Sequence, residues 1–201
     1  MRVGSGDDKK VWHLPEKLLK SNSTFFTAAL ESGFAEGIST IIPLPDQNPD
    51  IFRYFVDWLY VGLDQSAIII PDFLVPLWAL GDRLGCPLMQ NDAMGRLITY
   101  YDGPHIGEVT LKQIYELSAP KSKLRLFAVN QCLFDVRQHC PDGHENGGSY
   151  LQFVKDNEDF ARQLAEATVL LGSEDQNHPS YNRSPYLCGP SPCTSRRRSA
   201  S

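Results

Sequence analysis

Apolar residues recur at helical spacing through most of the chain, and this period constrains the fold more than any other feature. Asn48 and Pro49 favour a helix start, because one supplies a capping side chain and the other suits the first turn. An apolar stripe follows at i, i+3, i+4 and i+7, formed by Phe52, Phe55, Val56 and Leu59. The pattern predicts a helix over 49–60 with one buried face, ending near Gly62.

Further helices are predicted at short intervals along the chain. Their expected capping or first residues are Asp72, Pro87, Thr110, Ser122, Ser149 and Asn157. Gly85 is a stop signal, and Thr110 with Gln113 is typical of a capping box. The segment from Ser122 carries two apolar stripes, which indicate burial on both sides of that helix.

Strand candidates are few and short. The runs 10–14, 40–44 and 67–70 are rich in β-branched or aromatic residues or are bounded by turn residues. No internal repeat is visible. The sequence therefore predicts the α+β class, with a helical body and a small sheet of short strands.

Composition excludes several kinds of function. The hydrophobic fraction of 42% supports a real core, and the net charge of -5 argues against a general nucleic-acid binder. No apolar run is as long as a membrane span, and the N-terminus is polar and acidic rather than a secretory signal. The odd count of 5 cysteines fits a reducing compartment. We expect an intracellular protein, in the nucleus or the cytoplasm, without nucleic acid or membrane as a partner.

The last stretch has a different composition from the rest. Residues 173–201 are rich in Ser, Pro and Asn and show no hydrophobic period, so we expect a disordered tail. The tail ends in three arginines at 196–198, flanked by serines. Such a short run is weak evidence for a nuclear-import or phosphorylation signal, and a solvated chain end is the preferred interpretation.

The sequence contains no convincing catalytic constellation. Phosphate-loop and serine-hydrolase motifs are absent. The best group of metal-ligating or nucleophilic side chains is Cys132, His139, Cys140 and His144, whose spacing does not match a zinc-binding pattern. A core cysteine followed by a polar loop is preferred over a thiol or metal-dependent enzyme. We therefore predict no catalytic residue, metal site, cofactor or small-molecule substrate.

One ordered series of features, between Lys10 and Gly62, is specific enough to indicate a family. Its residues are His13, Lys17, Leu18, Leu19, Ser23, Phe25, Phe26, Ala28, Ala29, Leu30, Phe34, Glu36, Gly37, Ile42, Leu44, Pro45, Asp46, Pro49, Phe52, Phe55 and the run from Trp58 to Gly62. This series resembles the BTB/POZ family, especially its fungal members. Residues 73–97 resemble the family's next helical pair, and residues 109–136 resemble the helical extension of fungal members.

The resemblance implies three parts: a BTB/POZ domain over 3–101, a helical extension over 105–172, and the tail over 173–201. The expected fold of the domain is a cluster of short helices capped by a small sheet. The chain begins at what resembles the end of the first family strand, without the preceding helix that many animal members exchange when they dimerise. The usual dimer is therefore in doubt.

The same resemblance implies a protein-interaction module without enzymatic activity. Some BTB domains bind a cullin scaffold as substrate adaptors of ubiquitin ligases, through a hydrophobic-x-Glu motif. Here Phe34 and Glu36 match that motif, Phe34 as an apolar anchor and Glu36 as a charged contact. Two alternatives stay open. Phe34 is packed under the domain with Glu36 solvated, or the chain is a self-associating scaffold or transcription-associated regulator with no link to ubiquitin.

Overall fold

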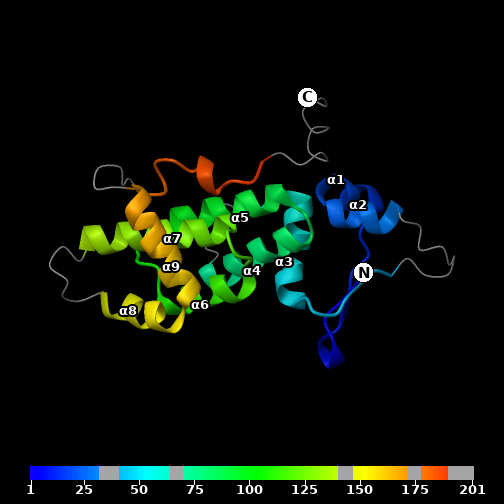
Figure 1. Ribbon diagram of the computed structural model, residues 1–201. Helices are drawn as coiled ribbons and strands as arrows, with labels where there is room; N and C mark the ends of the chain where they lie inside the picture. Colours follow the sequence, from blue (N-terminus) through cyan, green and yellow to red (C-terminus); the bar gives the residue numbers. More distant parts are fainter. Residues whose placement is uncertain (32–40, 64–69, 140–146, 172–177, 190–201) are drawn as a thin grey trace. The chain divides into compact units, whose positions relative to one another are not determined.

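The computed structural model describes residues 1–31, 41–63, 70–139, 147–171 and 178–189. These residues are mostly helical and include a small three-stranded sheet, which confirms the α+β class (Figure 1). The helices are α1 (Glu16–Asn22), α2 (Thr24–Glu31), α3 (Pro49–Val61), α4 (Pro71–Arg83), α5 (Pro87–Tyr100), α6 (Glu108–Leu117), α7 (Lys123–His139), α8 (Gly147–Asp156) and α9 (Glu158–Leu171), with short 3-10 turns η1 (Gly6–Asp8) and η2 (Ser184–Tyr186). None of the helices in the described ranges is long and apolar enough to cross a membrane.

The chain divides into two compact units, each discontinuous in sequence. The first contains Met1–Ile68, Pro76–Ala93 and Cys188–Ser201, and the second contains Ile69–Val75 and Met94–Leu187. These units are discontinuous, whereas the domains implied by the family resemblance are continuous segments. The predicted domain boundaries therefore stay a prediction.

The sheet of the first unit is built from three strands of two residues each. Its order is β2 (Lys10–Val11), β1 (Arg2–Val3) and β3 (Pro43–Leu44), with β1 antiparallel to β2 and parallel to β3. The predicted strands 10–14 and 40–44 are present in shortened form. In the run 67–70, residues 67–69 lie outside the described residues. β1 lies at the start of the chain, where the family resemblance implies the end of a first strand.

A row of aromatic rings fills the core of the first unit. Phe52 lies 5.0 Å from Trp12 and 5.2 Å from Phe55 between ring centroids, and Phe55 stacks on Phe26 at 6.2 Å. Phe26, Phe52 and Phe55 are fully buried. The side chain of Asn48 accepts hydrogen bonds from the backbone N–H groups at the start of α3. The predicted helix, its cap and its buried stripe are thus confirmed.

The start of α2 is joined to the residues that follow α4. The Ser23 hydroxyl donates to the Leu84 carbonyl at 2.5 Å. The backbone N–H of Thr24 donates to the Gly85 carbonyl at 3.2 Å, and that of Phe25 donates to Leu84 at 3.3 Å. Gly85 ends α4 in the left-handed region, with φ of 60°. Each helix end therefore satisfies backbone groups that the other leaves without an intrahelical partner.

Proline inside α4 removes one backbone donor from the helix. Pro76 has no N–H to donate to the carbonyl of Asp72. The side-chain amide of Gln113 in α6 donates to that carbonyl at 3.4 Å instead. The interruption is therefore compensated by a side chain of the second unit, which also contains Asp72.

Two of the predicted helix starts in the second unit, Ser122 and Asn157, are confirmed. Three are wrong, because Asp72, Thr110 and Ser149 lie inside α4, α6 and α8, which begin before them. Ser122 caps α7 and Asn157 caps α9, each accepting a backbone N–H bond. The capping box at Thr110 is wrong, because α6 begins earlier with Gly107 as its cap. Thr110 lies inside α6, where its hydroxyl accepts from the Tyr101 hydroxyl at 3.0 Å. The Thr110 side chain therefore bonds to a buried residue from outside α6 and does not cap the helix.

The expected second apolar stripe of α7 is only partly buried. Leu124 and Phe127 on the first stripe are fully buried. On the second stripe Leu133 is buried, whereas Leu126 and Val136 are more than a third exposed. Burial on both sides of α7 is thus incomplete.

Part of the expected disordered tail packs in the structure. We call residues 178–187 the strap. Two of its side chains, His178 and Tyr186, are buried within the second unit. Cys188, which follows, exchanges backbone hydrogen bonds with the side chain of Asn91 in the first unit. Residues 173–177 and 190–201, including the three arginines, lie outside the described residues.

The join between α2 and α4 predicts an unusual cost at Gly85. A Cβ there would lie 2.0 Å from the Thr24 hydroxyl oxygen, whereas a Cβ at Gly6, which has the same φ, would meet nothing within 4 Å. Gly6→Ala should lower the free energy of unfolding by about 1 kcal/mol, the cost of left-handed backbone. Gly85→Ala should lower it by about 1 kcal/mol or more in addition, because its Cβ also overlaps the Thr24 side chain.

Urea unfolding followed by circular dichroism measures both effects. Thr24→Ala should recover part of the loss in the Gly85→Ala background, because it removes the clashing oxygen. Equal costs at Gly6 and Gly85 would show that the joint relaxes freely and would contradict this prediction.

Candidate interaction surfaces

The residues implied as cullin contacts, Phe34 and Glu36, lie outside the described residues. The structure does describe both flanks of residues 32–40. Before them, α2 is held through Phe26 in the aromatic row. After them, the carbonyl of Ile42 accepts from the backbone N–H of Arg2 at 3.0 Å, and the Ile42 side chain is buried. Both flanks are therefore attached to the core of the first unit.

Of the four candidate thiol and metal residues, the structure describes the side chain of Cys132. Cys132 in α7 is fully buried, and burial raises the pKa of its thiol well above the usual value. A neutral thiol is a poor nucleophile and a poor metal ligand. The side chains of His139, Cys140 and His144 lie outside the described part of the chain. Among the residues that the structure describes, no three His, Cys, Asp or Glu side chains are arranged to hold a metal ion.

This environment predicts that Cys132 is unreactive in the folded protein. With iodoacetamide at neutral pH, Cys132 should be alkylated at least ~100-fold more slowly than Cys188, which is partly exposed. Peptide mass mapping after timed quenching measures the two rates, and unfolding in urea should bring them together. Rapid alkylation of Cys132 in the folded chain would restore the case for thiol chemistry.

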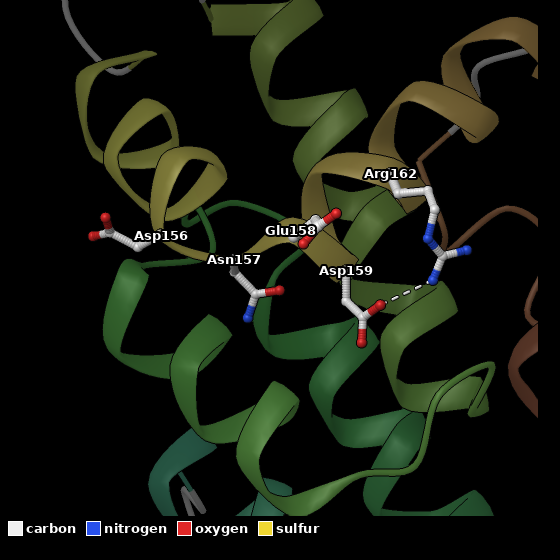
Figure 2. A pocket seen from close by; sticks show the side chains of 5 residues that line it. All are labelled: Asp156, Asn157, Glu158, Asp159 and Arg162. Carbon is white, nitrogen blue, oxygen red and sulfur yellow. Dashed lines mark hydrogen bonds and ion pairs between the residues drawn. The ribbon is translucent and has the colours of Figure 1, made fainter.

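A shallow pocket of about 580 Å³ lies at the junction of α8 and α9. Figure 2 shows its lining side chains, which are Asp156, Asn157, Glu158, Asp159 and Arg162. Asn157 is occupied as the cap of α9, and Asp156 points away from the pair formed by Asp159 and Arg162. The lining is therefore charged, without an apolar floor to bury a ligand.

Pairing already satisfies the only cation of this lining. Arg162 lies 2.9 Å from the Asp159 carboxylate and 3.3 Å from that of Glu166. The hydrogen bond from Arg162 lowers the pKa of the Asp159 carboxyl below its ordinary value. Exposed pairs of this kind are weak. The pocket is best explained as a polar helix junction.

A buried arginine links three elements of the second unit. Arg125 of α7 is 6% exposed, and its guanidinium donates to the Tyr115 and Ser118 carbonyls at 2.8 and 2.7 Å. It also lies 3.3 Å from the Asp159 carboxylate and 4.4 Å from the centroid of the Tyr115 ring. The positive charge thus meets the C-terminal end of α6, where the helix dipole favours a cation.

The arginine network predicts a large difference between Arg125 and Arg162, which both contact Asp159. Arg125→Ala should lower the free energy of unfolding by about 3 kcal/mol or more, because it leaves two buried carbonyls without a donor. Arg162→Ala should change stability little, since its side chain is exposed. Chemical denaturation followed by circular dichroism tests the pair. Similar small losses for both variants would show that the buried network is not a stabilising element.

The strap lies on α7 and on the end of α5. The ring of His178 meets Phe134 edge to face at 4.7 Å, and its Nε2 lies 2.9 Å from the Tyr101 carbonyl. Its Nδ1 lies 3.1 Å from the Asp102 carboxylate. The Tyr101 carbonyl also accepts from the side chain of Gln131 in α7. One carbonyl after α5 therefore ties both α7 and the strap to the same point.

The other end of the strap is held by the first half of α7. Tyr186 places its ring edge on Phe127 at 6.0 Å, and its hydroxyl accepts from the Asn130 side chain at 2.9 Å. The Lys123 ammonium donates to the Pro185 carbonyl at 2.6 Å. Sequence reasoning missed this surface, because these contacts join residues far apart in the chain. The only local signal was a histidine and two tyrosines in a segment otherwise poor in apolar residues.

The comparisons of the chain with protein-family models, curated proteins and solved structures find no match. The arguments for function therefore come from the residues and their contacts.

Proposed function

We propose that this chain is a non-catalytic protein-interaction protein whose N-terminal part is a BTB/POZ-type module of the fungal kind. The observation that carries the proposal is the ordered series of matching residues between Lys10 and Gly62. Two structural features support it. Phe26, Phe52 and Phe55 of this series form the aromatic core of the first unit, and short strands accompany them.

The proposed partner is a cullin scaffold, which makes the chain a candidate substrate adaptor of a ubiquitin ligase. Phe34 is the proposed anchor and Glu36 the charged contact beside it. Support comes from the flanks of the segment 32–40, since α2 and Ile42 are both attached to the same core. A segment attached at both ends loses less conformational entropy on binding than a free one.

The adaptor proposal predicts that a single side chain dominates cullin binding. Calorimetric titration of the full chain with the N-terminal domain of the cullin from the same organism should show saturable binding. Phe34→Ala should weaken it by about 1 kcal/mol or more, the level of an interface anchor. Tyr60→Ala is the matched control, because Tyr60 is an exposed aromatic residue of the first unit outside the proposed contact.

The Tyr60→Ala control and circular dichroism distinguish loss of the proposed contact from other causes of weaker binding. If folded wild-type chain does not bind the cullin domain, the adaptor proposal is wrong. If Tyr60→Ala weakens binding as much as Phe34→Ala, the contact lies elsewhere on the unit. Circular dichroism of each variant establishes that the loss is not caused by unfolding.

A self-associating scaffold is the second candidate, and one observation favours it. Within the described residues β2 pairs on one side only, with β1, and Val11 on β2 is 59% exposed. An unpaired edge strand with an exposed apolar side chain is a template for pairing with another chain. Sedimentation equilibrium over a range of concentrations tests this candidate, and a strictly monomeric chain would exclude it.

A further inference from the structure

The strap contacts the other elements of the second unit in the way that a bound peptide contacts a receptor. Apart from the short turn η2, it forms no helix or strand. Its buried residues stand near its ends, His178 and Pro179 at one and Tyr186 at the other. The residues between Tyr181 and Pro185 are exposed, and Tyr181 is 78% exposed. Widely spaced anchors with solvated residues between them are typical of extended-peptide recognition.

One face of α7 receives both anchors. Phe127 and Asn130 contact Tyr186, and Phe134 contacts His178. These three positions are separated by three and four residues, so they lie along one side of the helix. Each anchor ring packs edge to face against an aromatic ring of α7, and a polar atom of the anchor contacts a polar group. The surface therefore selects a ring that carries a hydrogen-bonding atom, rather than any apolar side chain.

Polar contacts along the strap fix its path over this face. Lys123 donates to the Pro185 carbonyl, and the Arg183 guanidinium donates to the Thr99 hydroxyl at 3.2 Å. The Ser180 hydroxyl donates to Asp102 at 3.2 Å. A hydrogen bond to a backbone carbonyl does not depend on which side chain the bound residue carries. The two anchors therefore determine the specificity, and the polar contacts around them determine the register of the strap.

We propose that this face of α7 is a peptide-binding surface which the strap occupies in cis. Its ligand in trans is an extended segment of a partner protein with a histidine and a tyrosine eight positions apart, as in the strap. A tethered segment competes at an effective concentration of about millimolar, so the strap excludes a partner peptide until its own contacts are weakened. The inference goes beyond the proposed function, because it does not depend on the first unit or on a cullin.

Ser180 offers a way to release the strap without deleting an anchor. Ser180→Asp would place a carboxylate beside Asp102, and like charges at this distance repel. Ser184→Asp is the matched control. Ser184 is an exposed serine of the same strap, and it starts η2, where an acidic side chain is tolerated.

The experiment measures fluorescence anisotropy of a labelled synthetic peptide with the sequence of residues 178–187, titrated with the full chain. The Ser180→Asp chain should bind the peptide saturably and at least ~10-fold more tightly than wild type. The Ser184→Asp chain should behave as wild type does. A peptide carrying alanine in place of both His178 and Tyr186 should bind none of the chains.

Every other outcome with a folded variant overturns the proposal. A folded Ser180→Asp chain that binds no peptide shows that the surface is not separable from its strap, and equal binding of the alanine peptide shows non-specific attachment. If Ser180→Asp does not fold, the full chain with His178→Ala and Tyr186→Ala replaces it and should bind the wild-type peptide. If circular dichroism shows that this chain is also unfolded, the strap is an integral part of the core and no peptide site exists.

Discussion

The arrangement of the first unit depends on the contact between the start of α2 and the residues after α4. Backbone groups at helix ends have no partner inside their own helix, and burying them without partners is costly. Here the Leu84 and Gly85 carbonyls accept from the Ser23 hydroxyl and from the first backbone N–H groups of α2. The contact also brings the positive end of one helix dipole to the negative end of another. It fixes the direction of α2, and through Phe26 it fixes α2 against the aromatic row.

Buried polar groups join the elements of the second unit to one another beside its apolar core. Arg125 connects the end of α6 to the start of α9, and the Tyr101 carbonyl connects α7 to the strap. Asp135, which is buried, accepts from Gln131 and from the backbone of Ile106 and thereby attaches the loop after α5. Such networks are costly when one member is lost, so they specify a unique arrangement of the helices.

Local signals in the sequence were sufficient to predict most helices, but they did not predict several contacts between distant residues. Asn48 and Gly62 act within a few residues of themselves, and α3 was predicted from them and its stripe. Thr110 resembles a cap locally, but Tyr101 determines its role. The strap was expected to be disordered because of its composition. Its burial depends instead on the contact of His178 with Tyr101, a partner 77 positions away, which no local pattern reveals. For Phe34 and Glu36, the resemblance gives an expectation that awaits the binding measurement.

The distribution of tryptophan makes the two units separately observable by light. The chain has 3 tryptophans, Trp12, Trp58 and Trp78, and all three belong to the first unit. Trp58 donates to the Asp92 carboxylate, whereas the Trp78 indole N–H is buried without a hydrogen-bond partner among the described residues. Emission excited at the red edge of indole absorbance therefore comes from side chains of the first unit. The second unit contains tyrosines but no tryptophan, so tyrosine absorbance is the signal that its own aromatic residues contribute.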